Sequence, residues 1–101
     1  MTIFACYCRD AEGSGPKREE NFASHLANIE ANMAALKVAG PLKDGDHTVG
    51  SLLIVEAEDA AAARTLLEQD PYYAAGVWES IMIDQFLGVA GGWVGGATWK
   101  K

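Results

Sequence analysis

The first half of the chain holds a run of strand-forming residues, followed by apolar positions at the spacing typical of a helix. Residues 2–8 are rich in residues that favour β-strands, and the turn-forming segment 10–16 ends that run. Over residues 17–39 the apolar positions follow one another at spacings of four, three, four and three, which predicts an amphipathic helix. These positions are Phe22, Leu26, Ile29, Met33 and Leu36. We expect Gly40 and Pro41 to stop the helix.

The middle of the chain has the pattern of a β-hairpin. A short edge strand is expected around Leu42 and Lys43, followed by a polar turn over residues 44–47 and a largely buried strand over residues 49–57. The turn begins like a calcium-binding loop, but no ligands follow at the later positions that such a loop requires. We therefore interpret it as a solvated turn.

A second helix and a last strand complete the pattern. Asp59 is a good N-cap for the helix, and Asp70 followed by Pro71 ends it, because the residue before a proline avoids helical angles. Residues 72–76 are expected to form a compact turn. Residues 77–87 alternate loosely between polar and apolar, which predicts a strand with one face against the helices.

The resulting order of elements, βαββαβ, is that of a ferredoxin-like α+β fold. In this fold two helices cover one face of a four-stranded antiparallel sheet. No internal repeat or linker divides the chain, so we expect a single domain over residues 1–101. Its core covers about residues 1–87, and a tail rich in glycine and tryptophan covers residues 88–101.

The other face of the predicted sheet also needs a cover. The third and fourth strands carry Ile and Val on both faces, and a chain of 101 residues offers no further helix to pack there. A second copy of the chain is the simplest cover, and two sheets packed face to face form a dimeric α+β barrel. The tail, with Trp93 and Trp99, is then available to reach across the homodimer interface.

Charge and hydropathy exclude several partners. The chain has 8 Lys and Arg against 14 Asp and Glu, a net charge of −6, which repels nucleic acids and anionic lipids. The uncharged stretch 86–99 is too short and too rich in glycine to cross a bilayer as a helix. Residues 1–5 lack the basic flank and long apolar run of a signal peptide. We expect a cytoplasmic protein without a membrane or nucleic-acid partner.

The two cysteines, Cys6 and Cys8, are expected to be free thiols. Two residues apart on a strand they point to the same face, where a disulfide between them would strain the backbone, so a reducing compartment fits best. Zinc binding with His25 or His47 is disfavoured because the spacing is not that of a zinc knuckle. We expect buried packing, and neither a metal nor an organic cofactor.

His25 is the first candidate for chemistry. It falls just outside the apolar stripe of the first predicted helix, on the same edge as Asn21 and Asn32. This places a polar strip at the margin of the buried face, where a pocket between helix and sheet can open. Taken alone, His25 is more simply interpreted as a half-exposed histidine on the flank of a helix.

Asp70 changes that balance. The inner face of the second helix carries Ala63, Leu66 and Leu67, and one more turn of the helix lands on Asp70, so its carboxylate should point inward. At a helix C-terminus a carboxylate costs roughly 0.3–1 kcal/mol unless a cation or donor offsets it, and His25 is a candidate partner. A His-Asp pair makes a sensible general base. Since Asp-Pro also commonly opens turns, spacing alone leaves both roles open for Asp70.

At this point the chain resembles the YciI-like (YCII-related) family, whose order of elements is similar to that of muconolactone isomerases and other dimeric α+β barrel proteins. The resemblance covers nearly all of the chain to about residue 87. It is carried by His25-Leu26, Gly40-Pro41, Gly50-Ser51-Leu52-Leu53-Ile54-Val55 and, most specifically, Asp70-Pro71-Tyr72 followed by Ala75-Gly76.

The resemblance implies a homodimer with a pocket in each subunit and a catalytic pair that carries over onto His25 and Asp70. Most members lack an assigned reaction. The few that have one are similar to dehalogenating or lactone-isomerising enzymes, which transfer protons without a metal. The tail after Leu87 departs from the usual ending of the family, so pocket access and substrate size do not carry over.

Three further residues are candidates for substrate binding. Tyr72 or Tyr73 is expected to line the pocket with its phenol while the other packs against the protein. Ser51, near the start of the central strand, offers a hydroxyl, but nothing marks it as a nucleophile. Arg18 ends the loop 12–18, which we interpret as a plain flexible loop rather than a phosphate site, although Arg18 is suited to steer an acidic substrate.

Three functions follow from these observations. The leading hypothesis is a small-molecule enzyme of the isomerase or dehydrohalogenase/lyase type, in which His25, oriented by Asp70, moves a proton on a small organic substrate. The alternative is a module that binds a ligand or partner in the same pocket without catalysis, because the sequence holds no strong nucleophile, metal or cofactor motif. The third is a purely structural dimer within a larger assembly, which predicts an apolar patch formed by the tail tryptophans.

Overall fold

The predicted strands pair into one antiparallel sheet with the spatial order β2-β3-β1-β4. The computed structural model describes residues 1–100, so Lys101, the last residue of the predicted tail, lies outside the described residues. The strands of the sheet are β1 (Thr2–Asp10), β2 (Leu36–Asp44), β3 (His47–Ala57) and β4 (Trp78–Gln85). The helices are α1 (Gly15–Glu20), α2 (Phe22–Ala31), α3 (Ala60–Glu68) and α4 (Pro71–Ala74), with a 3-10 turn η1 (Met33–Ala35). The tail adds β5 (Ala90–Gly91), the 3-10 turn η2 (Gly92–Val94) and β6 (Gly96–Ala97).

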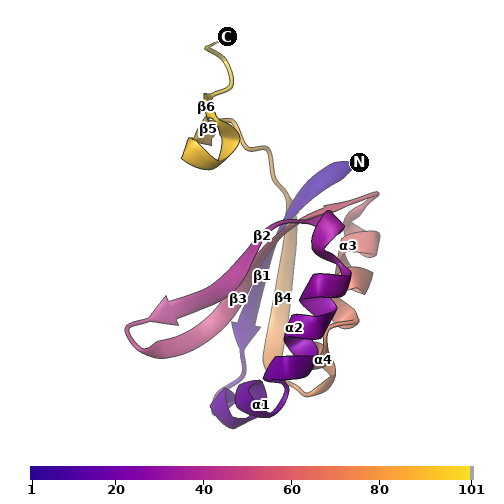
Figure 1. The fold of residues 1–101 in the computed structure, drawn as a ribbon, viewed down its shortest axis with the longest axis vertical. Coiled ribbons are helices and arrows are strands. Elements are labelled where there is room, and N and C mark those ends of the chain that lie inside the picture. The colour runs from indigo at the N-terminus through magenta and orange to yellow at the C-terminus, as the bar shows by residue number, and fades with distance from the viewer. Residues whose placement is uncertain (101) are drawn as a thin grey trace.

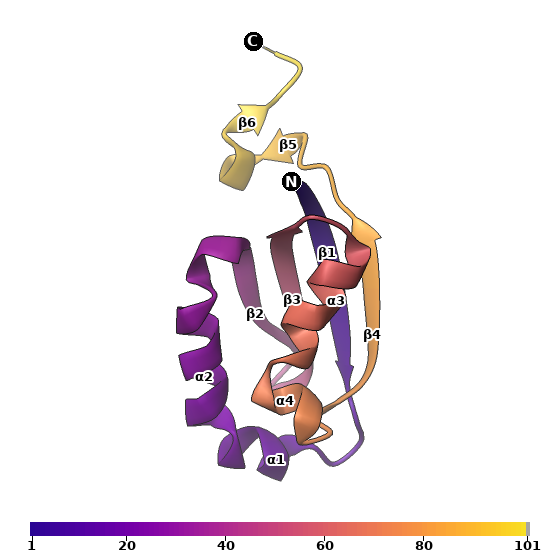
Figure 2. The same ribbon diagram turned by 90° about the vertical axis from the view of Figure 1, so that its right-hand side faces the viewer.

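Figures 1 and 2 show that all four helices lie on the same side of the sheet. The two longest, α2 and α3, run beside each other along the strands, and the short helices α1 and α4 close one end of this layer. Within residues 1–100, no helix or strand covers the opposite face of the sheet. This arrangement confirms the predicted ferredoxin-like α+β fold, with four helices in place of the two expected.

The core lies between the sheet and the helices because alternate residues of the strands point to that side. Cys6, for example, pairs with Leu53 on β3 and with Ile83 on β4, and all three side chains belong to or pack against the core. The buried hydrophobic residues are Phe4, Cys6, Cys8, Leu53, Val55, Ala57, Ala63, Leu67, Tyr72, Val77 and Trp78. The helix side of this core carries the site described below.

The helix predicted over residues 17–39 is wrong in its extent. It is broken at Asn21, which lies between α1 and α2, and it ends at Ala31. The side-chain amides of Asn21 and Asn32 bond to backbone carbonyls four residues earlier. Asparagine competes in this way with the regular helix and favours its termini, which explains both ends.

The segment after residue 35 is a strand, because it pairs with β3 along most of its length. Leu36 begins β2, and Gly40 and Pro41 lie inside β2, so the prediction that they stop a helix is wrong. The helical spacing of apolar residues continues from Met33 to Leu36, so the sequence did not reveal that a strand begins at Leu36.

The predicted apolar stripe is also only partly buried. Ile29 packs against the core, but Phe22, Leu26 and Met33 are 53%, 43% and 57% exposed. No residue of α2 is fully buried. Helix α2 therefore rests on the core by a narrow contact, with apolar side chains left at its outer margin.

The uncovered face of the sheet is apolar in its centre. The residues of β1 and β3 that point away from the helices include Ala5, Tyr7, Leu52 and Ile54, with Val38, Leu42 and Met82 on the neighbouring strands. Tyr7 and Met82 are 37% and 63% exposed in the single chain. Among the described residues, none of the helices has the length and hydropathy needed for a membrane span.

Cys6 and Cys8 are free thiols buried within the core. Burial raises the pKa of the Cys6 thiol from 9.0 to about 11. Burial, together with nearby negative charge, raises the pKa of the Cys8 thiol to about 12. Both thiols therefore stay protonated while the protein is folded, since the core does not solvate a thiolate.

We expect the free energy of unfolding to fall as the pH rises from about 9 to about 11. In that window the unfolded chain releases thiol protons that the folded chain retains, so alkali favours unfolding. Urea titrations at about pH 8 and about pH 10.5 measure the loss, and the Cys8→Ala variant should lose less between the two pH values. An equal loss in both proteins would contradict this explanation.

Candidate functional site

His25 on α2 and Asp70 at the start of α4 are in direct contact, although 45 positions separate them in the chain. His25 Nδ1 lies 2.9 Å from Asp70 Oδ1 and 2.7 Å from Oδ2. Since a carboxylate accepts hydrogen bonds, Nδ1 carries the proton of this contact and Nε2 is left for another partner. The side chains are 16% and 2% exposed, so the histidine reaches solvent and the carboxylate does not.

The position of Asp70 follows from the local sequence Asp-Pro-Tyr. Helix α3 ends at Glu68, and Asp70 is the N-cap of α4, where its Oδ1 accepts a hydrogen bond of 2.9 Å from the backbone N–H of Tyr72. Pro71 fills the first helical position, which favours proline. Asp70 thus lies at a helix N-terminus, which favours a carboxylate, and not at the helix C-terminus that we predicted.

Tyr72 holds the imidazole from its other side. The rings of His25 and Tyr72 stack with 3.9 Å between centroids and 8° between planes. The Arg18 guanidinium carbon lies 4.9 Å from the centroid of the Tyr72 ring, and the Tyr72 hydroxyl donates a bond of 3.4 Å to the Arg18 carbonyl. Burial raises the pKa of Tyr72, so its phenol stays neutral. Tyr73, in contrast, is 41% exposed.

Arg18 is fixed by a second carboxylate. Its Nε and Nη2 donate to the two oxygens of Asp10 at 2.6 and 2.9 Å, and Nη2 also donates to the Gly50 carbonyl at 3.1 Å. Burial alone would lower the pKa of Arg18, but the hydrogen bonds and charge of Asp10 outweigh it, so this pKa is raised. The guanidinium is therefore a permanent positive charge with a defined orientation.

Ser51 links this charge to the core. Its Oγ accepts a bond of 2.9 Å from Arg18 Nη2 and one of 3.3 Å from Trp78 Nε1. Both neighbours only donate, so the Ser51 hydroxyl proton is not used by either contact. Ser51 is 5% exposed. A buried hydroxyl beside a guanidinium is a good donor to a negatively charged oxygen.

A pocket of about 370 Å³ brings these groups together. Arg18, His25, Ser51 and Tyr72 supply its polar atoms. Its remaining walls are formed by Phe22, Leu26, Ile29, Ala39, Gly40, Pro41 and Leu53. An apolar pocket with a few convergent polar groups is the usual form of a small-molecule site.

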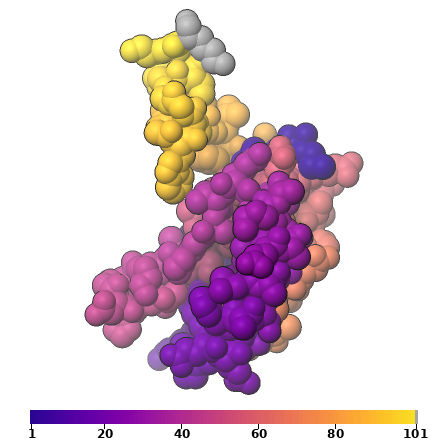
Figure 3. All heavy atoms as spheres, viewed as in Figure 1, coloured from indigo at the N-terminus to yellow at the C-terminus, as the bar shows by residue number. Residues whose placement is uncertain are grey.

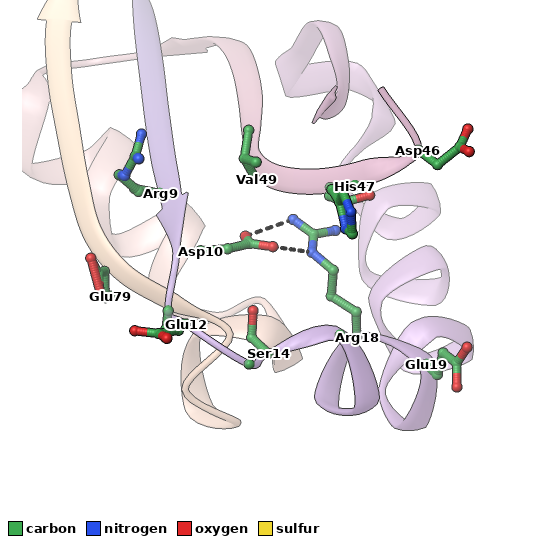
Figure 4. A pocket seen from close by; sticks show the side chains of 14 residues that line it. Arg9, Asp10, Glu12, Ser14, Arg18, Glu19, Asp46, His47, Val49 and Glu79 are labelled. Atoms are coloured by element: carbon green, nitrogen blue, oxygen red, sulfur yellow. Dashed lines mark hydrogen bonds and ion pairs between the residues drawn. The ribbon is translucent and has the colours of Figure 1, made fainter. Parts of the chain in front are cut away.

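A larger and more open cavity, of about 730 Å³, lies at the end of the sheet near the β2–β3 turn. Figure 4 shows Asp10 and Arg18 paired at its inner wall, with Glu12, Glu19 and Glu79 around the rim. Since Arg18 lines both cavities, the two are separated by the Asp10–Arg18 pair. His25 and Tyr72 line the smaller pocket and not the larger cavity, so the smaller pocket is the candidate functional site.

The structure thus brings His25, Asp70, Tyr72, Ser51 and Arg18 to one place. Three contributors were not singled out in the sequence; they are Asp10, which orients Arg18, Trp78, which bonds to Ser51, and Asn28, whose amide lies 3.4 Å from Asp70. Asn28 lies about one helical turn after His25, so the helical spacing alone places its side chain on the same face as His25. The neighbouring Asn21 and Asn32 bond to the backbone instead.

Over residues 1–100 no group of three or more His, Cys, Asp and Glu side chains is arranged to hold a metal ion. Cys6 and Cys8 lie in the core, and His47 lies at the exposed start of β3. The groups that the smaller pocket offers for chemistry are the imidazole of His25, the guanidinium of Arg18 and the hydroxyls of Ser51 and Tyr72.

Comparisons with known proteins agree with this description. The chain is 31% identical over 93 residues to the protein YciI of Escherichia coli O6:H1, covering 83% of this chain and 95% of that protein. Among solved structures it is similar to the 5-chloro-2-hydroxyhydroquinone dehydrochlorinase of Burkholderia phenoliruptrix, determined with 2,5-dihydroxybenzoquinone. Here the identity is 32%, the TM-score is 0.77, and the match covers 89% of this chain and 96% of the other.

A more distant structure, a protein of unknown function from Nitrosomonas europaea, shares the fold with 21% identity and a TM-score of 0.54, covering 87% of this chain and 92% of that one. The structural neighbours have the ferredoxin-like fold of dimeric α+β barrel proteins, which confirms the predicted fold class. Residues 2–87 match the YCII-related domain. The chain, over almost the whole of its predicted core, is a member of the family of proteins with a YCII-related domain.

Proposed function

We propose that this protein is a small-molecule enzyme in which His25 transfers protons as a general base and acid. The observation that carries this proposal is the contact of 2.7 Å between His25 Nδ1 and a buried Asp70 carboxylate at the wall of an open, largely apolar pocket. A pocket for binding alone needs no such pair. The pair fixes the tautomer of the imidazole and stabilises the imidazolium that forms when Nε2 takes a proton.

The substrate class follows from the shape and polarity of the pocket. Its volume of about 370 Å³ suits a single ring, and its apolar walls favour a planar, poorly charged molecule. Ser51 and Arg18 are placed to receive an oxygen that becomes negative when His25 removes its proton. A small hydroxylated aromatic compound has the size of a single ring, apolar faces and an oxygen that can become negative. The related dehydrochlorinase acts on such a compound.

The reaction balances without an external oxidant. Removal of a ring hydroxyl proton by His25 leaves an oxyanion beside Ser51 and Arg18, and its electron pair delocalises into the ring. Return of the proton from the imidazolium to a ring carbon gives a keto tautomer, which is an isomerisation. If that carbon carries chlorine, departure of chloride and of a second hydroxyl proton yields a quinone, so that HCl is lost overall. The ring is oxidised as the carbon–chlorine bond is replaced by a carbon–hydrogen bond.

We expect chloride release from 5-chloro-2-hydroxyhydroquinone by the wild-type protein and a loss of about 10²–10⁴-fold in kcat/KM in the His25→Ala variant. Asp70→Asn keeps an acceptor for the Tyr72 N–H and should fold, yet it removes the negative charge and lowers kcat by about tenfold or more. Ion-selective measurement of chloride follows both. The exposed Tyr73→Phe variant is the matched control and should retain full activity.

Two results would contradict this proposal. Equal rates in wild type and His25→Ala would remove the histidine from the mechanism. Binding of 2,5-dihydroxybenzoquinone without turnover of any halogenated or isomerisable ring substrate would favour the alternative, a binding module that uses the same pocket.

The Ser51→Ala variant tests the assignment of the oxyanion site. We expect kcat to fall by about 10–10³-fold with a smaller change in KM, because the hydroxyl acts mainly on the charge that develops during the reaction. The same change leaves Trp78 Nε1 without its acceptor and should lower the free energy of unfolding by about 1–3 kcal/mol. Adding Trp78→Phe removes that orphaned donor, so the double variant separates the loss of stability from the loss of rate. A loss of rate that disappears in the double variant would contradict the assignment.

We also propose that the protein is a homodimer through the uncovered face of its sheet. The described chain exposes 6551 Å², whereas a compact monomer of this size exposes about 5,500 Å². The excess of about 1,000 Å² is close to the ~800 Å² that each partner buries in a stable interface. The apolar centre of that face, around Leu52 and Ile54, supports the same conclusion.

Light scattering of the purified protein should give twice the mass of the chain across a wide range of concentrations. Ile54→Lys places an unpaired charge in the proposed interface and should weaken the dimer by about a hundredfold or more. The control is Ala61→Lys on the exposed side of α3, which should leave the dimer intact. A monomeric wild type would refute the interface, and species larger than a dimer would favour the structural-assembly hypothesis.

A further inference from the structure

The tail over residues 88–100 has a defined shape. Strands β5 and β6 pair with each other, and the backbone N–H of Thr98 donates to the Val89 carbonyl at 2.9 Å. Gly91, Gly95 and Gly96 have positive φ angles that other residues rarely adopt, so the glycines of the tail set its turns. These turns place Trp93 at the tip of η2 with 88% of its surface exposed.

This shaped tail does not pack on the body of its own chain. Figures 1 and 2 show it beyond the end of the sheet, joined by the segment after β4, and Figure 3 shows it projecting past the rest of the molecule. The radius of gyration of 14.3 Å exceeds the ~12.7 Å of a compact chain of this length. Within residues 1–100, Trp93 and Trp99 thus remain 88% and 67% exposed, as large apolar side chains of a shaped segment.

The same chain has a second unpartnered apolar surface at the mouth of the smaller pocket. Phe22 and Leu26 line this pocket and are 53% and 43% exposed. On the other side of the mouth lies the middle of β2, residues 39–41, which is also exposed. The pocket therefore opens between α2 and the edge strand β2, and its rim is apolar.

The sheet order relates these two surfaces across a dimer. Strands β2 and β4 are the two edges of the sheet. If two open faces meet about a two-fold axis that runs along the strands, the order of strands is reversed in the partner, and β4 lies against the partner's edge β2. The tail continues from β4 and leans to the side of the sheet away from the helices, where the partner lies (Figure 1).

We propose that the tail of each subunit covers the mouth of the partner's pocket, with Trp93 packing over Phe22 and Leu26. The inference depends on the proposed homodimer and not on the proposed reaction. Each site is then completed by an aromatic side chain from the other chain, which excludes water from the His25–Asp70 pair and adds a flat surface against which a ring can stack. The same contact explains why the single chain exposes more surface than a compact monomer and why its tail extends away from its own body.

Cross-linking between chains of different mass tests this proposal. An untagged Trp93→Cys protein is mixed with an affinity-tagged Leu26→Cys protein, subunits are exchanged, and a short bismaleimide is added. Cys6 and Cys8 stay silent because they are buried and their pKa values are raised to about 11 and about 12. We expect a covalent band with the mass of one tagged and one untagged chain. The matched control, tagged Glu68→Cys on the exposed side of α3, should give at least tenfold less of that band.

The outcomes separate this proposal from the others. Absence of the mixed band in a protein that light scattering shows to be dimeric overturns the tail contact alone. A cross-link within single chains that carry both Trp93→Cys and Leu26→Cys, without one between chains, overturns it in favour of a tail that covers its own pocket. A monomeric protein overturns both the dimer and the tail contact. The activity of the His25→Ala variant tests the proposed reaction and leaves the result of the cross-linking unchanged.

Discussion

The site depends on how one buried carboxylate is stabilised. Asp70 is 2% exposed, and a charge removed from water to this extent persists only if donors surround it. The donors come from the imidazole of His25, the amide of Asn28 and the backbone N–H of Tyr72. Two of them lie on α2, so the same contacts that satisfy the carboxylate also attach α2 to the rest of the domain. Fold and candidate chemistry share this interaction.

A second ion pair, between Arg18 and Asp10, contacts the same aromatic ring as the first pair. Tyr72 lies between the imidazole of the first pair and the guanidinium of the Arg18–Asp10 pair. The ring thus contacts both an imidazole and a permanently charged guanidinium, and all three side chains line the same pocket. The Ser51 hydroxyl is bonded to Arg18, so an imidazole from α2, a guanidinium from α1 and a hydroxyl from β3 line the same pocket.

Most strands were predictable because short runs of residues that favour β-strands, with polar and apolar residues alternating loosely in the last strand, are visible in the local sequence. The boundary between helix and strand near Leu36 was not, because β-pairing with a distant segment overrides a local helical spacing. The His-Asp pair was predictable in kind from the faces of two helices, but the position of Asp70 at an N-cap was not, since it depends on where α3 ends. Asp10 and Trp78 were missed because their roles exist only through contacts with Arg18 and Ser51.

Helix α2 has no fully buried residue, and this has a consequence for how such proteins diversify. The polar groups of the site are fixed by hydrogen bonds to α4 and to the sheet, while Phe22 and Leu26 form one wall of the pocket and are largely exposed. Substitutions along that wall carry a small penalty in stability compared with changes in a closed core. If the proposed function holds, substitutions along this wall can change which compound fits the pocket while the His25–Asp70 contact is kept.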